Sequence, residues 1–267
     1  MPLPLHSPGR LVSTLVALAA LIPAAAPLGA QPDADYQKLL EEKAPAIVGI
    51  RFVLKTPGDW GAGGNQREIR GVMIAPDGLV LCASSSLDDD WSGRGGDAAA
   101  PTQIKVLIGD DTQGLDARCV ARDSELDLSW LRIEQPGERK FPSVSLTGAA
   151  PPEIGQRVYC VNRLGKYFGS TPYVEEARIG GMISKPRRLY YPSGAAGALG
   201  LPCFDARGAV VGVFVSQMPD RDESDDGGWE WSAGYGMILP VDEVARATER
   251  AGQLAQLDAG HATRPSE

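Results

Sequence analysis

The sequence predicts an all-β protein, built either as two antiparallel β-barrels or as a β-sandwich, with one C-terminal helix. Three observations predict this class. Short runs of β-branched and other apolar residues recur along most of the chain. Turns rich in Gly and Pro separate these runs. Near the C-terminus, apolar residues recur instead at helical spacing. Periodicity alone does not separate two barrels from a sandwich.

The first half of the chain carries six predicted strands. A brief helical turn precedes the first of them. The segment Ala75–Gly78, "APDG", predicts a tight turn because Pro, Asp and Gly favour turn conformations. Loops are expected over residues 57–65 and 88–102. The predicted strands are Ala46–Leu54, Ile69–Ile74, Leu79–Cys82, Ile104–Ile108, Leu115–Ala121 and Leu126–Ile133.

The second half repeats this pattern after a break at Pro136–Pro142. Val241–Leu257 predicts an amphipathic helix with apolar residues at 241, 244, 248, 251 and 254. We therefore expect an N-terminal segment and first barrel over 31–135, a second barrel over 136–240, and a helix with a polar tail over 241–267. The predicted strands of the second half are Arg157–Asn162, Val174–Ile183, Ala198–Phe204, Ala209–Ser216 and Tyr235–Pro240.

Residues 1–30 have the pattern of a secretory signal peptide. Arg10 is their one charged residue, the apolar run Leu11–Ile22 follows it, and small residues precede Ala30. The alternative is a membrane anchor, but the run of 12 residues is short for a span of about 20. The sequence thus predicts cleavage after Ala30, export to the periplasm or the medium, and no membrane span after cleavage.

Charge and composition exclude several functions. The formal net charge is −8, which disfavours binding to the phosphate backbone of nucleic acid. None of the four cysteines lies in a CxxC pair, so a zinc site is not expected. The acidic loop 219–228 lacks the ordered spacing of a calcium loop and is expected to be solvated. We expect no metal and no cofactor.

The chain has two histidines, and neither lies in the predicted folded body. His6 falls in the leader and His261 in the polar tail. Histidine is the usual general base near neutral pH because its pKa lies close to the working pH. A mechanism that needs a His base from within residues 36–250 is therefore excluded.

Seven segments in one order resemble the trypsin-like serine protease domain of the HtrA/DegP type. The resemblance covers roughly residues 40 to 250, and it implies two six-stranded antiparallel barrels with the active site in the cleft between them. The chain ends soon after the predicted helix, so no PDZ domain is expected. HtrA-type proteases are commonly trimers held by N-terminal elements, but Gln31–Lys43 is short and polar, so we do not extend the resemblance to a trimer. The segments are "APAIVGIRF", "GVMIAPDGLVLCASS", "DSELDLSWLRI", "GQRVYCVNRLG", "GGMIS", "GLPCFDARGAVVGVFVS" and "GYGMILPVDEV".

In that family a Ser attacks, a His takes its proton and an Asp orients the His. The resemblance places the Asp at Asp127, within "LDLSWLR". It places Ser85, in the segment "CASSS", where the family has the His. It places Leu199, within "GALGLP", where the family's "GNSGGP" motif has the nucleophilic Ser. Although the chain resembles a serine endopeptidase, two of its three triad positions hold residues that cannot perform their roles.

We therefore interpret the chain as a pseudoprotease that binds a peptide or a protein. One alternative is an active serine endopeptidase with an unrecognised nucleophile. Ser193 is a superficial candidate, but it lies six residues too early for the motif spacing. A second alternative is a structural scaffold of the cell envelope with no function in the cleft. Without a histidine, a structural role for Asp127 with Ser85 as its partner is favoured.

The resemblance also implies a binding cleft and a cysteine pair. Ala198 and Gly200 would line the cleft, where backbone N–H groups form an oxyanion-hole-like nest or where Leu199 plugs it. Cys160 and Cys203 would lie nearly opposite each other on neighbouring strands. They form either a cross-strand disulfide or two buried thiols.

Overall fold

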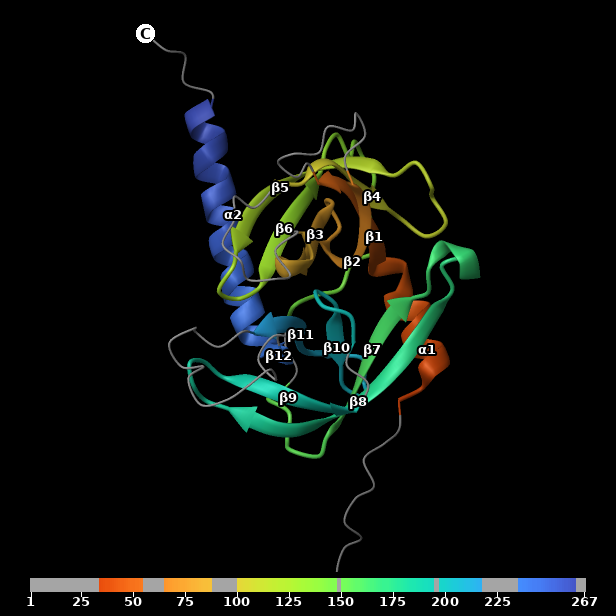
Figure 1. The fold of residues 1–267 in the computed structure, drawn as a ribbon, viewed down its shortest axis with the longest axis vertical. Coiled ribbons are helices and arrows are strands. Elements are labelled where there is room, and N and C mark those ends of the chain that lie inside the picture. The colour runs from red at the N-terminus through yellow and green to blue at the C-terminus, as the bar shows by residue number, and fades with distance from the viewer. Residues whose placement is uncertain are drawn as a thin grey trace, which may run out of the picture. The chain divides into compact units, whose positions relative to one another are not determined.

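The structure is a computed structural model of the 267-residue chain. It describes residues 34–54, 65–87, 100–147, 150–194, 197–217 and 235–262, with side chains as far as 254 in the last helix. These residues form two closed six-stranded antiparallel β-barrels and a C-terminal helix (Figure 1). The predicted double-barrel fold is confirmed, and the sandwich alternative is wrong. The predicted leader and acidic loop lie outside the described residues, as do 57–64 and 88–99.

The first barrel has the strand order β1-β2-β3-β6-β5-β4 and closes through the pairing of β1 with β4. Its interior is filled by apolar side chains that alternate along the strands, and β1 is buried along nearly its whole length. All six predicted strands of this half are present, with ends shifted by a few residues. They are β1 (Ile47–Leu54), β2 (Asn65–Ala75), β3 (Leu79–Ala83), β4 (Thr102–Leu107), β5 (Leu115–Asp123) and β6 (Leu128–Ile133).

The second barrel has the order β10-β11-β12-β9-β8-β7 and closes where β10 pairs with β7. In that pairing Cys203 lies directly opposite Cys160. The barrel encloses a second set of buried aromatic and aliphatic side chains. Its strands are β7 (Arg157–Arg163), β8 (Pro172–Ile183), β9 (Leu189–Gly194), β10 (Pro202–Phe204), β11 (Val210–Gln217) and β12 (Tyr235–Pro240).

Two features of the second barrel differ from the prediction. Strand β9 was not predicted, because its Pro192 and Gly194 are residues that usually interrupt strands. It pairs with β12 at only one position, Ile238 with Tyr190. The prediction of a strand over Ala198–Phe204 is wrong in its first half, since β10 begins at Pro202. Gly200 has φ +83°, a left-handed conformation that turns the chain before the strand.

The N-terminal helix α1 (Tyr36–Lys43) packs on the second barrel, although the chain then passes into the first. Asp35 caps it by accepting a 3.1 Å hydrogen bond from the backbone N–H of Lys38. The ring of Tyr36 lies edge-on to that of Tyr159 in β7, with 5.8 Å between centroids. The short 3₁₀ turn η1 (Ala44–Ala46) then leads into β1.

Arg163, at the end of β7, ties the second barrel to the start of the first. Its guanidinium donates to the backbone oxygens of Ala44 at 2.8 Å and Ile47 at 3.2 Å. A third bond, at 3.1 Å, reaches Ser170 O in its own barrel. The planar guanidinium presents donors in a fixed fork, so one side chain holds three carbonyl groups at once.

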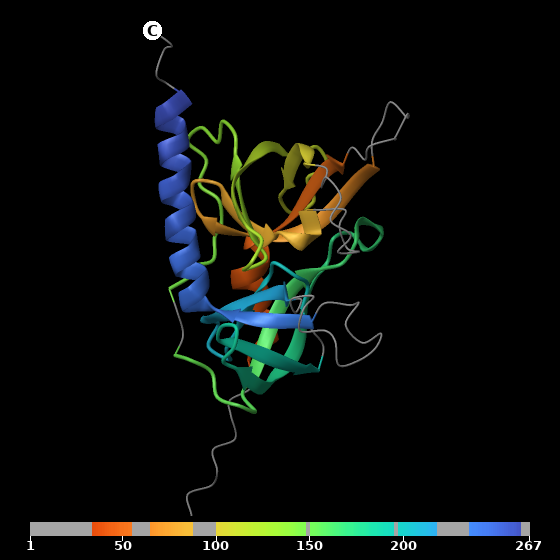
Figure 2. The same ribbon diagram turned by 60° about the vertical axis from the view of Figure 1, so that its left-hand side comes forward.

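The C-terminal helix α2 (Val241–Ala262) begins directly after β12 and runs along the side of the first barrel (Figure 2). It contacts β11 and β12 of the second barrel and β5 of the first. The buried indole of Trp130, in β6, donates a 3.0 Å hydrogen bond to Thr248 Oγ1. In the described part of the chain, none of the helices has the length and apolar character needed to cross a membrane.

Candidate functional site

The candidate site begins where β3 ends, at a tight corner next to Asp127. The backbone N–H of Ser84 donates to Asp127 O at 3.1 Å, and a 3₁₀ turn, η2 (Ser85–Leu87), follows. Asp127 itself has φ +58°, in the left-handed region, which Asp tolerates better than most residues. This conformation ends any extended run at Asp127, so β6 starts at Leu128 rather than at the predicted Leu126.

The Asp127 carboxylate joins the two barrels. One oxygen accepts the backbone N–H of Ser85 at 2.6 Å, and the other accepts the backbone N–H of Ser216 at 2.6 Å. Ser85 belongs to the first barrel and Ser216 to β11 of the second. Asp127 is only 3% exposed. Burial raises the pKa of this carboxyl above its usual value, although both backbone bonds, the Ser85 hydroxyl and the charge of Arg122 act to lower it.

The two serines at the corner have different surroundings. The hydroxyl of Ser84 accepts a short hydrogen bond from Arg122 Nε, while Arg122 Nη2 donates to Ser84 O at 2.9 Å. Ser85 is half-buried, and its hydroxyl lies close enough to the Asp127 carboxylate to lower the pKa of Asp127. Its hydroxyl oxygen nevertheless makes no hydrogen bond of normal geometry with any described residue. Ser85 therefore contacts Asp127 at the predicted His position chiefly through its backbone.

The segment that carries Leu199 is a tight turn pressed against this corner. Leu201 N–H donates to Ala198 O at 3.1 Å, and Gly200 N–H donates to Phe214 O at 2.7 Å. A Cβ placed on Gly200 would lie 2.3 Å from the backbone nitrogen of Ala83, at the end of β3. Leu199 is half-buried beside this contact. The structure thus brings Asp127, Ser85 and the Leu199 turn together at one junction of the two barrels.

The two predicted cleft residues, Ala198 and Gly200, differ in burial and in the groups that they contact. Gly200 is buried between the turn and β3, so its role is in packing rather than in contact with a ligand. Ala198 is half-buried, and its backbone N–H acts on the sulfur of Cys160 by lowering its pKa.

Cys160 and Cys203 are both buried free thiols, so the cross-strand disulfide is absent from the structure. The sulfur of Cys160 instead packs against Gly197, where a Cβ would approach it to 2.6 Å. Burial raises the pKa of Cys160 well above its usual value and that of Cys203 to about 12. Both groups are then protonated thiols near neutral pH, whereas disulfide chemistry needs the thiolate.

Among the described residues, the corner holds one buried carboxylate, that of Asp127. Ser85 cannot serve as a general base near neutral pH, and Leu199 has no nucleophilic atom. Ser193 lies on β9, opposite Arg178 of β8, so its neighbours are residues of the second barrel and not the corner. Among the residues that the structure describes, no three His, Cys, Asp or Glu side chains gather as metal ligands would.

The sequence did not identify Arg122 or Ser216 as members of the site. Ser216 follows the apolar run "VVGVFV", and a polar residue at the end of a buried strand was the available signal. Its partner is 89 residues away in the sequence. The sequence around Arg122 carries no comparable signal.

Comparison with known proteins agrees with this fold. A family model, the trypsin-like peptidase domain, matches residues 70–213. Among solved structures, an HtrA-type protease, a variant of AlgW described with a tripeptide, matches with a TM-score of 0.56 and 18% sequence identity. The match covers 81% of this chain and 63% of that one, and at this identity it supports the fold alone. No curated protein matches. The family model spans more than half of the chain, which therefore belongs to the trypsin-like peptidase domain family.

Proposed function

We propose that this member of the family is an exported pseudoprotease that binds a peptide or a protein segment. The observation that carries the proposal is the composition of the barrel junction. Asp127 is held by two backbone N–H groups, while Ser85 and Leu199 stand where the resemblance places the His and the nucleophilic Ser. The catalytic roles of those two positions need an imidazole and a hydroxyl or thiol group.

A peptide ligand is supported by the location of the site and by one solved relative. The junction lies between two barrels, and ligand sites commonly form at such interfaces. The HtrA-type relative AlgW is described with a tripeptide. In this chain Leu199 would present an apolar side chain where a peptidase presents its nucleophile. Binding can then use the surface of the site without a chemical step.

The absence of catalysis is tested by treating the purified protein with a fluorophosphonate and by incubating it with unfolded casein. We expect no mass shift and no cleavage. The double variant S85H/L199S is the matched comparison, because it would restore an imidazole beside Asp127 and a hydroxyl on the turn. Labelling of the variant at position 199 would support the assigned positions. Stoichiometric labelling of the wild type would show an active peptidase and refute the proposal.

Binding is tested by selecting displayed peptides on the immobilised protein and measuring the affinity of the enriched sequences. The variant L199W fills the site, and L254W makes the same change at an exposed position of α2. We expect L199W to weaken the selected peptides by about tenfold or more and L254W to leave them unchanged. No enrichment, or equal affinity for both variants, would favour the scaffold alternative.

Export rests on the pattern of residues 1–30. We expect the mature protein from a host that processes the leader to begin at Gln31. Recovery of the uncleaved chain in the membrane fraction would instead support the anchor.

A further inference from the structure

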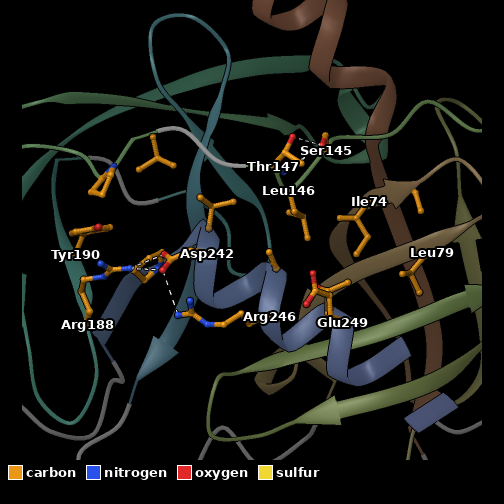
Figure 3. A pocket seen from close by; sticks show the side chains of 17 residues that line it. Ile74, Leu79, Ser145, Leu146, Thr147, Arg188, Tyr190, Asp242, Arg246 and Glu249 are labelled. Carbon is orange, nitrogen blue, oxygen red and sulfur yellow. Dashed lines mark hydrogen bonds and ion pairs between the residues drawn. The ribbon is translucent and has the colours of Figure 1, made fainter. Parts of the chain in front are cut away.

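A groove of about 770 Å³ opens between helix α2 and both barrels (Figure 3). The first barrel supplies Ile74 and Leu79, and the second supplies Val211. Leu146, from the connection between the barrels, and Ala245 of α2 complete an apolar wall. Its size falls within the range of about 300–1,000 Å³ that is usual for small-molecule sites.

The groove is distinct from the candidate functional site. Strand β3 begins at Leu79 in the groove and ends at Ala83 beside the Ser85 corner. Four steps of extended chain, from residue 79 to residue 83, separate the two ends by roughly 13 Å. Likewise, β11 contributes Val211 to the groove and Ser216 to Asp127. The two sites lie at opposite ends of shared strands.

The guanidinium groups at one end of the groove already have carboxylate partners. Arg188 Nη2 donates to both oxygens of Asp242, at 2.7 and 2.6 Å. Arg246 Nη2 lies 3.3 Å from Asp242 Oδ2 and 2.6 Å from Glu243 Oε1. The two guanidinium groups therefore face the carboxylates of Asp242, in the lining, and of Glu243, just outside it.

Glu249 is the remaining charged residue of the lining. Within the described residues, its carboxylate makes no hydrogen bond and no ion pair. Figure 3 shows it on α2 beside Leu146 and Ile74, next to the apolar wall. The groove therefore combines an apolar surface with one carboxylate, that of Glu249, which has no partner among the described residues.

We propose that this groove binds a small amphiphilic cation. The apolar body of the ligand lies against Ile74, Leu79 and Leu146, and its ammonium or guanidinium group faces Glu249. A helix is too large, because two turns of about 11 Å diameter already occupy on the order of 1,000 Å³.

The test is calorimetric titration of the full chain with dodecyltrimethylammonium below its micelle concentration. We expect saturable binding at one site. Laurate has a similar chain and the opposite charge, and we expect it to bind at least about tenfold more weakly. The variant E249Q should weaken the cation by roughly two- to fivefold, the range of an exposed ion pair. E138Q removes one negative charge from an exposed position outside the groove and should change nothing.

A second variant, A245F, places a ring in the groove and should reduce the affinity about tenfold or more. Its thermal unfolding is measured without ligand, so that a folding defect is distinguished from a filled groove. E249Q changes an exposed side chain and tests the proposal independently of packing. Absence of binding, equal affinity of E249Q and E138Q, or a preference for laurate or for a peptide would each overturn the proposal.

Discussion

Gly200 gives the most direct test of the contact between the Leu199 turn and the corner that holds Ser85. In G200A, the new Cβ would lie 2.3 Å from Ala83 N and 2.9 Å from Cys82 C, both of which are backbone atoms. The left-handed φ of +83° costs an alanine about 1–2 kcal/mol. Overpacking against backbone adds about 1–3 kcal/mol. The expected loss of unfolding free energy is therefore roughly 2–5 kcal/mol.

Gly155 supplies the matched control. Its φ is +87°, and a Cβ placed there meets no atom within 4 Å. G155A should therefore lose only the conformational part, about 1–2 kcal/mol. Urea unfolding of the two variants and the wild type gives both values, provided that the dependence on urea concentration is unchanged. If G200A and G155A agree within about 0.5 kcal/mol, the turn does not press on β3, and the site as described is wrong.

Two further predictions concern residues that join the barrels. In D127N the side chain no longer titrates. The raised pKa of Asp127 means that the native state holds this proton more tightly than the unfolded chain does. The stability of the wild type relative to D127N should then be greatest below pH 3.8 and fall as pH rises through the native pKa. Urea unfolding of both proteins at a series of pH values measures this difference. A difference in unfolding free energy that does not change with pH would contradict the raised pKa. R163K keeps the positive charge but loses the planar guanidinium that holds three carbonyl groups, so we expect a loss of about 1–3 kcal/mol in unfolding free energy. The control R118K, at an exposed position, should change the unfolding free energy by less than about 0.5 kcal/mol. Equal losses for the two variants in urea unfolding would refute the role of Arg163.

The parts of the fold that the sequence predicted are those in which local pattern and packing agree. Strand β1 is an apolar run that only one charged residue, Arg51, interrupts, and the structure buries the rest of it. β12 and the start of α2 at Val241 were predicted at their observed positions, because Pro240 separates a period of two from a helical period. Strand β9 was missed because its pairing partners, and not its own residues, hold Pro192 extended.

The site was harder to predict because its contacts cross between the barrels. The resemblance placed Ser85 near Asp127, and the 2.6 Å backbone bond agrees with that expectation. The bond from Ser216 could not be inferred from local sequence, since it depends on how β11 docks beside the corner. The left-handed conformation of Asp127 likewise has no local signal, because Asp occurs in many conformations.

Asp127 has a structural role that needs no histidine, because its carboxylate accepts backbone N–H groups from both barrels. If its side chain were replaced by an apolar one, the backbone N–H groups of Ser85 and Ser216 would each lose an acceptor in a buried place. A buried donor without a partner costs about 1–3 kcal/mol, so two of them would remove a large share of the stability of a typical domain. The fold does not need the hydroxyl of Ser85 or the side chain of Leu199 in the same way, because neither makes a hydrogen bond to a described backbone group. In this protein the carboxylate is therefore fixed by the joining of two barrels. Its presence in a trypsin-like domain therefore does not by itself indicate catalysis, and the proposal of a binding protein rests on the residues at positions 85 and 199.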